Sequence, residues 1–168
     1  MLSKSIEEAL NNQLNAEFAA AYLYLSMSAW FESIHLKGFG GWLNAQFDEE
    51  QAHASKFYHF ILDRGGKVVL QAMDAPRNEW DSPLAAIEDA LSSEKQVTKS
   101  IHNLKELADA EKDHATSVML QWFITEQVEE EDTFDSIVEQ LKMIDDSKAG
   151  MYLFDSDMGK RPTTVISG

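Results

Sequence analysis

The sequence contains no cysteine among its 168 residues. This absence excludes disulfides, thiolate zinc sites, iron-sulfur clusters and rubredoxin-type iron, because each of these needs cysteine sulfur. Any metal that the chain binds must therefore be held by oxygen and nitrogen. Carboxylates dominate the oxygen donors, and five histidines supply imidazole nitrogen.

Basic residues are also scarce. Lysine and arginine total 14 against 29 aspartates and glutamates, which gives a formal net charge of -15. A charge of this sign repels a phosphate backbone and attracts cations. The composition therefore argues against a nucleic-acid partner and favours a cation as ligand.

Long apolar runs are missing as well. No stretch of about eighteen apolar residues is available to span a bilayer. The first residues, MLSKSIEEAL, become amphipathic at once instead of forming the apolar core of a signal peptide. We expect a cytoplasmic protein without a membrane partner, folded as one domain over residues 1–168, because this length with 44% hydrophobic residues supports one core.

Only three prolines and eight glycines occur, and they fall between long segments of helical periodicity. A capping box at Ser5 to Glu8 predicts the first helix start, Gly65 and Gly66 predict the end of the second helix, and Ser82-Pro83 predicts the start of the third. The expected helices span about 5–33, 38–64, 83–111 and 114–144, with a short fifth at 147–157.

The segment 66–82 shows no sustained period, and an extended chain of this length reaches about 50 Å. A helix of the length of 38–64 measures only about 40 Å, so this connection can travel the full length of a bundle. The second and third helices can then run parallel. Four long helices with one long crossover predict an all-α, ferritin-like four-helix bundle.

Polar residues interrupt the apolar stripe of every long helix near its middle. In the second helix, Glu50 and His53 lie on the same stripe as Leu43, Phe57 and Ile61. Because helix midpoints share one level in such a bundle, we expect the interrupting residues to converge. They are Glu17, Glu50, His53, Glu94, Gln127 and Glu130.

A repeated spacing supports this convergence. Glu17 and Glu50 are 33 positions apart, as are Glu94 and Gln127, and His53 and Glu130 each follow three residues later. The two halves of the chain look like degenerate copies, each with one single ligand and one pair on a shared helix face.

Buried carboxylates that face one another are costly unless protons or cations neutralise them. Four glutamates carry a charge of -4, which balances two divalent ions, while His53 and Gln127 remain neutral. Oxygen-rich ligation with one imidazole suits iron or manganese. Any one of these acids could instead lie at the edge of its apolar stripe with the carboxylate extended into solvent. Only their joint occurrence favours a pair of metal ions.

At these residues the chain closely resembles the non-haem bacterial-type ferritins. The resemblance rests on Glu17, the EEQAH at 49–53, Glu94, the EQVEEE at 126–131 and the MYLFD near the C-terminus. It implies a ferroxidase that oxidises Fe²⁺ with dioxygen or peroxide and stores ferric mineral in a hollow homo-oligomeric shell of twenty-four subunits.

The resemblance also implies roles for single residues. One iron would be held by Glu17, Glu50 and His53, and the other by Glu50, Glu94 and Glu130, with Gln127 beside them. A third iron site would use Glu49, Glu126, Glu129 and Glu130, although a solvated acidic face explains these acids equally well. Tyr24 and Trp122 correspond to residues linked to radical chemistry in similar proteins, and an ordinary core tyrosine is the alternative for Tyr24.

The sequence differs from two related families, the bacterioferritins and the rubrerythrins, at residues that those families need for their cofactors. Bacterioferritins use a methionine two residues before the histidine of the second helix to hold haem, and here that position is Gln51, so we expect no haem. Rubrerythrins need a cysteine-ligated iron, which this chain cannot provide because it has no cysteine. The remaining alternatives are a purely structural helical bundle and a di-metal oxidase without storage. The histidines at 35, 59, 102 and 114 show no partner spacing and are expected at the surface.

Overall fold

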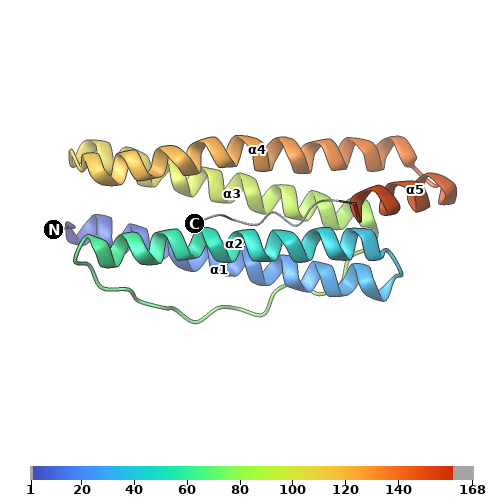
Figure 1. Ribbon diagram of the computed structural model, residues 1–168, viewed down its shortest axis with the longest axis horizontal. Helices are drawn as coiled ribbons and strands as arrows, with labels where there is room; N and C mark the ends of the chain where they lie inside the picture. Colours follow the sequence, from blue (N-terminus) through green and yellow to red (C-terminus); the bar gives the residue numbers. More distant parts are fainter. Residues whose placement is uncertain (1, 161–168) are drawn as a thin grey trace.

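The computed structural model describes residues 2–160 and contains five helices within them (Figure 1). The helices are α1 (Lys4–Ser33), α2 (Lys37–Asp63), α3 (Pro83–Ala110), α4 (His114–Ile144) and α5 (Lys148–Met158). The first four are antiparallel within the pairs α1/α2 and α3/α4, and α1 also packs against α3. The predicted all-α four-helix bundle is confirmed, and its helix limits lie within one residue of those expected.

The connection from Arg64 to Ser82 runs along the outside of the bundle from one end to the other, so that α2 and α3 point in the same direction (Figure 1). Two buried asparagines of α1 hold it in place. The backbone N–H of Val69 donates to Oδ1 of Asn11 at 2.6 Å, and Nδ2 of Asn15 donates to the carbonyl of Val69 at 2.9 Å. These side chains satisfy backbone groups that have no helical partner.

Local signals explain most of the helix ends. Gly65 adopts a left-handed φ of 70° at the end of α2, and the Ser82 hydroxyl accepts from the N–H of Ala85 at 3.1 Å at the start of α3. The capping box predicted at Ser5 is wrong. Ser3 caps α1 instead, accepting from the N–H of Ile6 at 3.2 Å, while the Ser5 hydroxyl is drawn away to the carboxylate of Glu111.

The buried apolar residues form two separate clusters, one toward each end of the bundle. Each long helix contributes to both clusters and changes from one to the other near its middle. On α1, for example, Leu14 belongs to one cluster and Tyr24 to the other, with Glu17 between them. A polar layer therefore divides the core, as the interrupted stripes predict.

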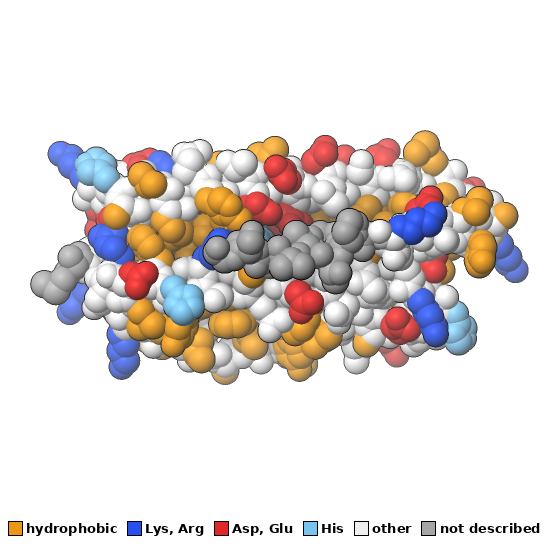
Figure 2. All heavy atoms as spheres, in the orientation of Figure 1, with side chains coloured by type: hydrophobic (Ala, Val, Ile, Leu, Met, Phe, Trp, Pro, Cys, Tyr) orange, Lys and Arg blue, Asp and Glu red, His pale blue; other side chains and the backbone are white. Residues whose placement is uncertain are grey.

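Outside this layer, the surface is strongly charged. The face seen in Figure 2 carries acidic side chains along the bundle, with basic side chains mostly toward its two ends. Within residues 2–160, no helix is both long enough and apolar enough to cross a membrane.

Candidate metal centre

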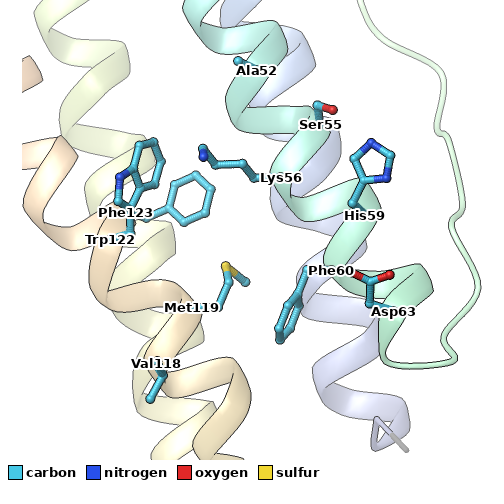
Figure 3. A pocket seen from close by; sticks show the side chains of 10 residues that line it. All are labelled: Ala52, Ser55, Lys56, His59, Phe60, Asp63, Val118, Met119, Trp122 and Phe123. Carbon is cyan, nitrogen blue, oxygen red and sulfur yellow. The ribbon is translucent and has the colours of Figure 1, made fainter. Parts of the chain in front are cut away.

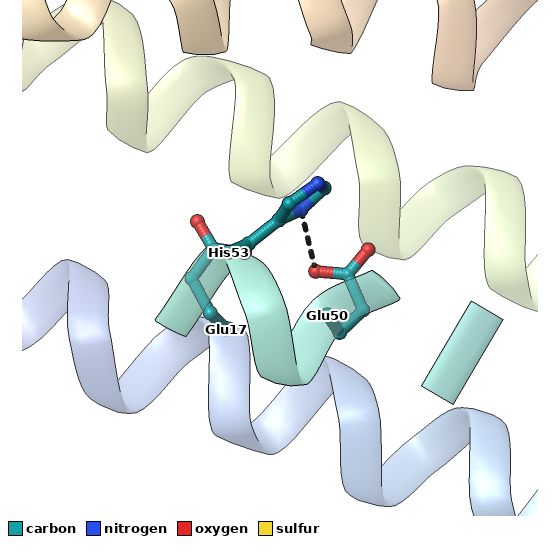
Figure 4. A group of neighbouring side chains, drawn as sticks. All are labelled: Glu17, Glu50 and His53. Atoms are coloured by element: carbon teal, nitrogen blue, oxygen red, sulfur yellow. Dashed lines mark hydrogen bonds and ion pairs between the residues drawn. The ribbon is translucent and has the colours of Figure 1, made fainter. Parts of the chain in front are cut away.

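Glu17 from α1 and Glu50 and His53 from α2 form the tightest group of candidate ligands (Figure 4). All three are buried, and each offers a ligand atom within 4.8 Å of those of the other two. Nδ1 of His53 lies 3.2 Å from Oε2 of Glu50. The spacing of three residues on α2 places both side chains on one face of the helix, where they meet Glu17 from the neighbouring helix.

Glu17 is incompletely satisfied. Its Oε1 accepts a hydrogen bond from Nε2 of Gln13 at 2.8 Å, whereas its Oε2 is buried without a hydrogen-bond partner among the described residues. An unpaired buried oxygen costs free energy, and a cation bound to it removes that cost. Two carboxylates and an imidazole also form a donor set that suits Fe²⁺. The residues present therefore fit a metal ion.

The acids of α3 and α4 are equally buried but are tied to hydrogen-bond donors. Glu94 accepts from the hydroxyl of Tyr24 and, at 3.0 Å, from Nε2 of Gln127. Glu130 accepts from Nε2 of Gln46 at 2.9 Å. The two halves of the predicted site thus differ in geometry: within residues 2–160, Glu17, Glu50 and His53 form the only group of three or more such residues with ligand atoms within 4.8 Å of one another.

Burial makes all four carboxyl groups reluctant to ionise. It raises the pKa of Glu17 and of Glu50 well above the ordinary value, and a neighbouring carboxylate adds to the rise in each case. The pKa of Glu94 is also raised by burial, against the lowering effect of its hydrogen bonds from Tyr24 and Gln127. Burial and the nearby charge of Glu94 raise the pKa of Glu130 to about 8. Without a cation, the centre therefore retains protons near neutral pH.

Two buried glutamines, which were not predicted from the sequence, complete the centre. Gln13 and Gln46 are almost fully buried, at 1% and 0% exposure, and donate to Glu17 and Glu130 respectively. A signal was available, because each glutamine stands four residues before a candidate ligand of its own helix: Gln13 before Glu17, and Gln46 before Glu50. Residues at this spacing lie on one helix face.

The acids expected at a third iron site are placed differently. Glu49 and Glu126 are half-buried, Glu129 is exposed, and Glu130 is buried. The structure does not bring ligand atoms of these four residues as close together as those of Glu17, Glu50 and His53. The third site remains a prediction.

Two aromatic residues border the centre. Tyr24 is fully buried, and its hydroxyl donates a hydrogen bond to Glu94. Burial and the charge of Glu94 raise the pKa of Tyr24. Trp122 lies edge-on to His53, with ring centroids 5.5 Å apart, in a groove between α2 and α4 (Figure 3). Nζ of Lys56 lies over its ring at 4.4 Å. The other four histidines are exposed, as expected.

A four-helix bundle with a long crossover and a mid-height layer of acids and histidine defines a class of proteins that bind metals within one subunit. The chain matches the model of the ferritin-like domain over residues 7–144. It is 40% identical to the bacterial non-heme ferritin of Staphylococcus aureus over 161 residues, which cover 96% of this chain and 97% of the relative. The chain belongs to the ferritin-like family.

Solved structures agree with this assignment. An open-pore ferritin from the hyperthermophilic archaeon Archaeoglobus fulgidus superposes with a TM-score of 0.95 and 48% identity, covering 96% of this chain and all of that one. A humanized archaeal ferritin gives the same TM-score at 47% identity, covering 96% of this chain and 98% of that one.

Proposed function

We propose that the chain is the subunit of an iron-storage protein that oxidises Fe²⁺ to Fe³⁺ at its buried acidic layer and keeps the product as ferric mineral inside a shell. Membership of the ferritin-like family and the high identity to ferritins over nearly the whole chain support this function. The observation that carries the catalytic part is the convergence of Glu17, Glu50 and His53 around one point, with an oxygen of Glu17 left unpartnered.

Two Fe²⁺ ions are the substrates. One is bound by Glu17, Glu50 and His53, and the second by Glu50, Glu94 and Glu130, so that Glu50 is shared. The four carboxylates balance the charge of two Fe²⁺ ions, while two Fe³⁺ ions leave an excess of positive charge. The two ions together give up two electrons, which with two protons reduce dioxygen to hydrogen peroxide, or reduce hydrogen peroxide to two water molecules. One oxide or two hydroxides formed from water, whose protons leave to the solvent, cancel the excess charge of the Fe³⁺ pair before it passes to the mineral.

The second iron needs the acids of α3 and α4 to exchange partners. Glu94 must turn from Tyr24 and Gln127, and Glu130 must leave Gln46. Metal bonds then replace two hydrogen bonds of Glu94 and one of Glu130, and the released donors face the centre. Gln127 and Tyr24 become free to donate to an oxidant or to its reduced product.

The third iron site belongs to the same proposal. Glu126 and Glu129 are three residues apart on α4, and they extend the acids from Glu130 toward the surface. With Glu49 they can receive an ion that leaves the pair. This site would be weaker than the other two, because two of its acids are only half-buried and one is exposed.

The shell is proposed as a homo-oligomer of twenty-four copies, because storage needs a closed container. Sedimentation velocity tests this directly. A large hollow particle is expected, whereas a stable monomer or dimer would leave a di-metal oxidase without storage.

Anaerobic titration with Fe²⁺, followed by mixing with dioxygen, tests the reaction. We expect two tightly bound ions per chain and rapid formation of Fe³⁺. Crystals soaked in Fe²⁺ should show ions among Glu17, Glu50 and Glu94. Binding of ions only at exposed acids, with these side chains unchanged, would refute the proposed centre.

A further inference from the structure

Gln13 is a buried amide in contact with a candidate metal ligand, and neither its helix nor its burial requires a polar side chain there. It lies one turn before Glu17 on α1 and is only 1% exposed. Both ends of its amide are used: Nε2 donates to Oε1 of Glu17 at 2.8 Å, and Oε1 accepts from the Ser100 hydroxyl of α3 at 2.5 Å. The amide therefore links α3 to the metal centre.

The direction of the amide follows from these two contacts. Ser100 donates to the oxygen of Gln13, which leaves the NH₂ group for Glu17. When a cation holds Glu17 ionised, an amide turned the other way would place its oxygen against a carboxylate oxygen, and two acceptors repel. Ser100, half-buried at the wall of a groove between α1, α3 and the crossover, anchors the oxygen end of the amide in this orientation.

The consequence concerns the two oxygens of Glu17. Oε1 is occupied by Gln13, whereas Oε2 is buried and has no hydrogen-bond partner among the described residues. The geometry points to Gln13 as a positioning residue that makes Glu17 a ligand through one oxygen only, with Ser100 anchoring its amide. This inference rests on the proposed function: Gln13 determines which oxygen of Glu17 binds the ion.

A single-oxygen ligand has a chemical advantage for the first iron. Glu50 must serve two ions, so the first iron depends on Glu17 for a ligand oxygen at a fixed position, and the hydrogen bond from Gln13 to Oε1 holds the other oxygen there. Partners that orient a ligand typically change metal affinity by about 10- to 100-fold when they are removed. Gln13 therefore acts on binding of Fe²⁺ more than on the electron-transfer step.

The decisive variant is Gln13→Met, which keeps the length and apolar stem but removes the donor. We expect Fe²⁺ to bind the first site roughly 10-fold more weakly in an anaerobic titration. The KM for Fe²⁺ should rise by a similar factor while kcat at saturating Fe²⁺ falls much less. In Fe²⁺-soaked crystals of the variant, Glu17 should bind the ion through both oxygens instead of one.

Gln96→Met is the matched control, because Gln96 is an exposed residue of α3 in the same groove. It should leave affinity and coordination unchanged. Equal losses in the two variants, wild-type affinity in Gln13→Met, or weaker binding with Glu17 still attached through one oxygen would each overturn the inference.

Ser100→Ala provides a second test if Gln13→Met fails to assemble. Freeing the amide should weaken Fe²⁺ binding several-fold and give a mixture of one-oxygen and two-oxygen coordination by Glu17. Unchanged affinity and coordination would overturn the inference. The wild-type protein separates the two hypotheses: absent Fe²⁺ binding there refutes the proposed function, whereas normal wild-type binding with unaffected variants refutes only the role of Gln13.

Discussion

The two halves of the chain build the two halves of the centre differently, although they share one spacing. In the α1/α2 half, Glu17, Glu50 and His53 converge, and one carboxylate oxygen lacks a partner. In the α3/α4 half, Glu94 and Glu130 each accept hydrogen bonds from neighbouring side chains. The first half already holds its ligand atoms together and has only to release protons when a cation binds, whereas the second must also exchange its hydrogen-bond partners.

Spacing along a helix therefore determines the face on which a side chain lies, but it does not determine which groups its carboxylate contacts. The donors that distinguish the halves come from across the bundle: Tyr24 reaches Glu94 from α1, and Gln46 reaches Glu130 from α2. The α1/α2 half thus supplies both a convergent site and the donors that hold the other half. From this asymmetry we expect the first ion to bind on the α1/α2 side.

Removal of Glu50, the proposed shared ligand, should have the largest effect. Glu50→Ala deletes a bond to both ions, and we expect the fast phase of Fe²⁺ oxidation to slow by more than about 100-fold. Stopped-flow mixing with dioxygen measures the rate, and sedimentation checks that the particle still forms. Glu88→Ala, at an exposed acid of α3, is the control. A surviving fast phase in Glu50→Ala would contradict the ligand assignment.

The next largest effect separates the two halves. Glu130→Ala should leave the first Fe²⁺ bound and weaken the second by about 10-fold or more, because only the second ion loses a ligand. Glu17→Ala should instead weaken the first. Anaerobic titration distinguishes these patterns through the number of tight ions per chain. If both variants lost the same ion, the order of binding inferred from the asymmetry would be wrong.

The fold of this chain was largely accessible from its sequence. Interrupted apolar stripes placed the polar layer, and Ser82-Pro83 and Gly65 marked helix ends correctly, because these signals are local or strictly periodic. The cap of α1 was not resolved in this way. Ser5, with Glu8 three residues later, fits the capping box, whereas Ser3 is followed by Ile6 and does not. The contact of both serines with Glu111, more than a hundred positions away, is invisible to local reasoning.

The candidate site was predictable in composition but not in detail. Burial of six polar residues followed from their places on the stripes, and the structure buries all six. The asymmetry did not follow, since it depends on Tyr24 and Gln46 approaching from other helices. Gln13 escaped notice because an amide on a stripe looks like an ordinary tolerated polar residue until its two partners are known.

A moderate effect is expected for Tyr24→Phe, which removes the hydroxyl that holds Glu94. The freed carboxylate should bind the second Fe²⁺ more readily, so the titration should show tighter binding of that ion by a few-fold. Oxidation at saturating Fe²⁺ should slow if the hydroxyl also serves the oxidant. Unchanged affinity for the second ion would show that Tyr24 does not restrain Glu94.

The last effect does not involve iron and concerns the stability of the metal-free protein. The pKa of Glu130 is raised from 4.5 to about 8, so the folded chain holds a proton that the unfolded chain has released between these values. Stability must then fall as pH rises from about 4.5 through about 8, because the unfolded state binds fewer protons. Glu130→Gln cannot ionise, and this part of the pH dependence should disappear from it.

Urea denaturation of the metal-free proteins at several pH values within that window tests the prediction. The denaturation midpoint of the wild type should drop more steeply than that of Glu130→Gln, and the two curves should draw closer toward the acidic limit. Addition of Fe²⁺ without oxygen should reverse the sign for the wild type, because bound cations displace the proton and favour the ionised centre at higher pH. A wild-type midpoint that tracked Glu130→Gln throughout would mean that Glu130 ionises freely, and the α3/α4 half would then lack the buried, protonated carboxyl group inferred for it.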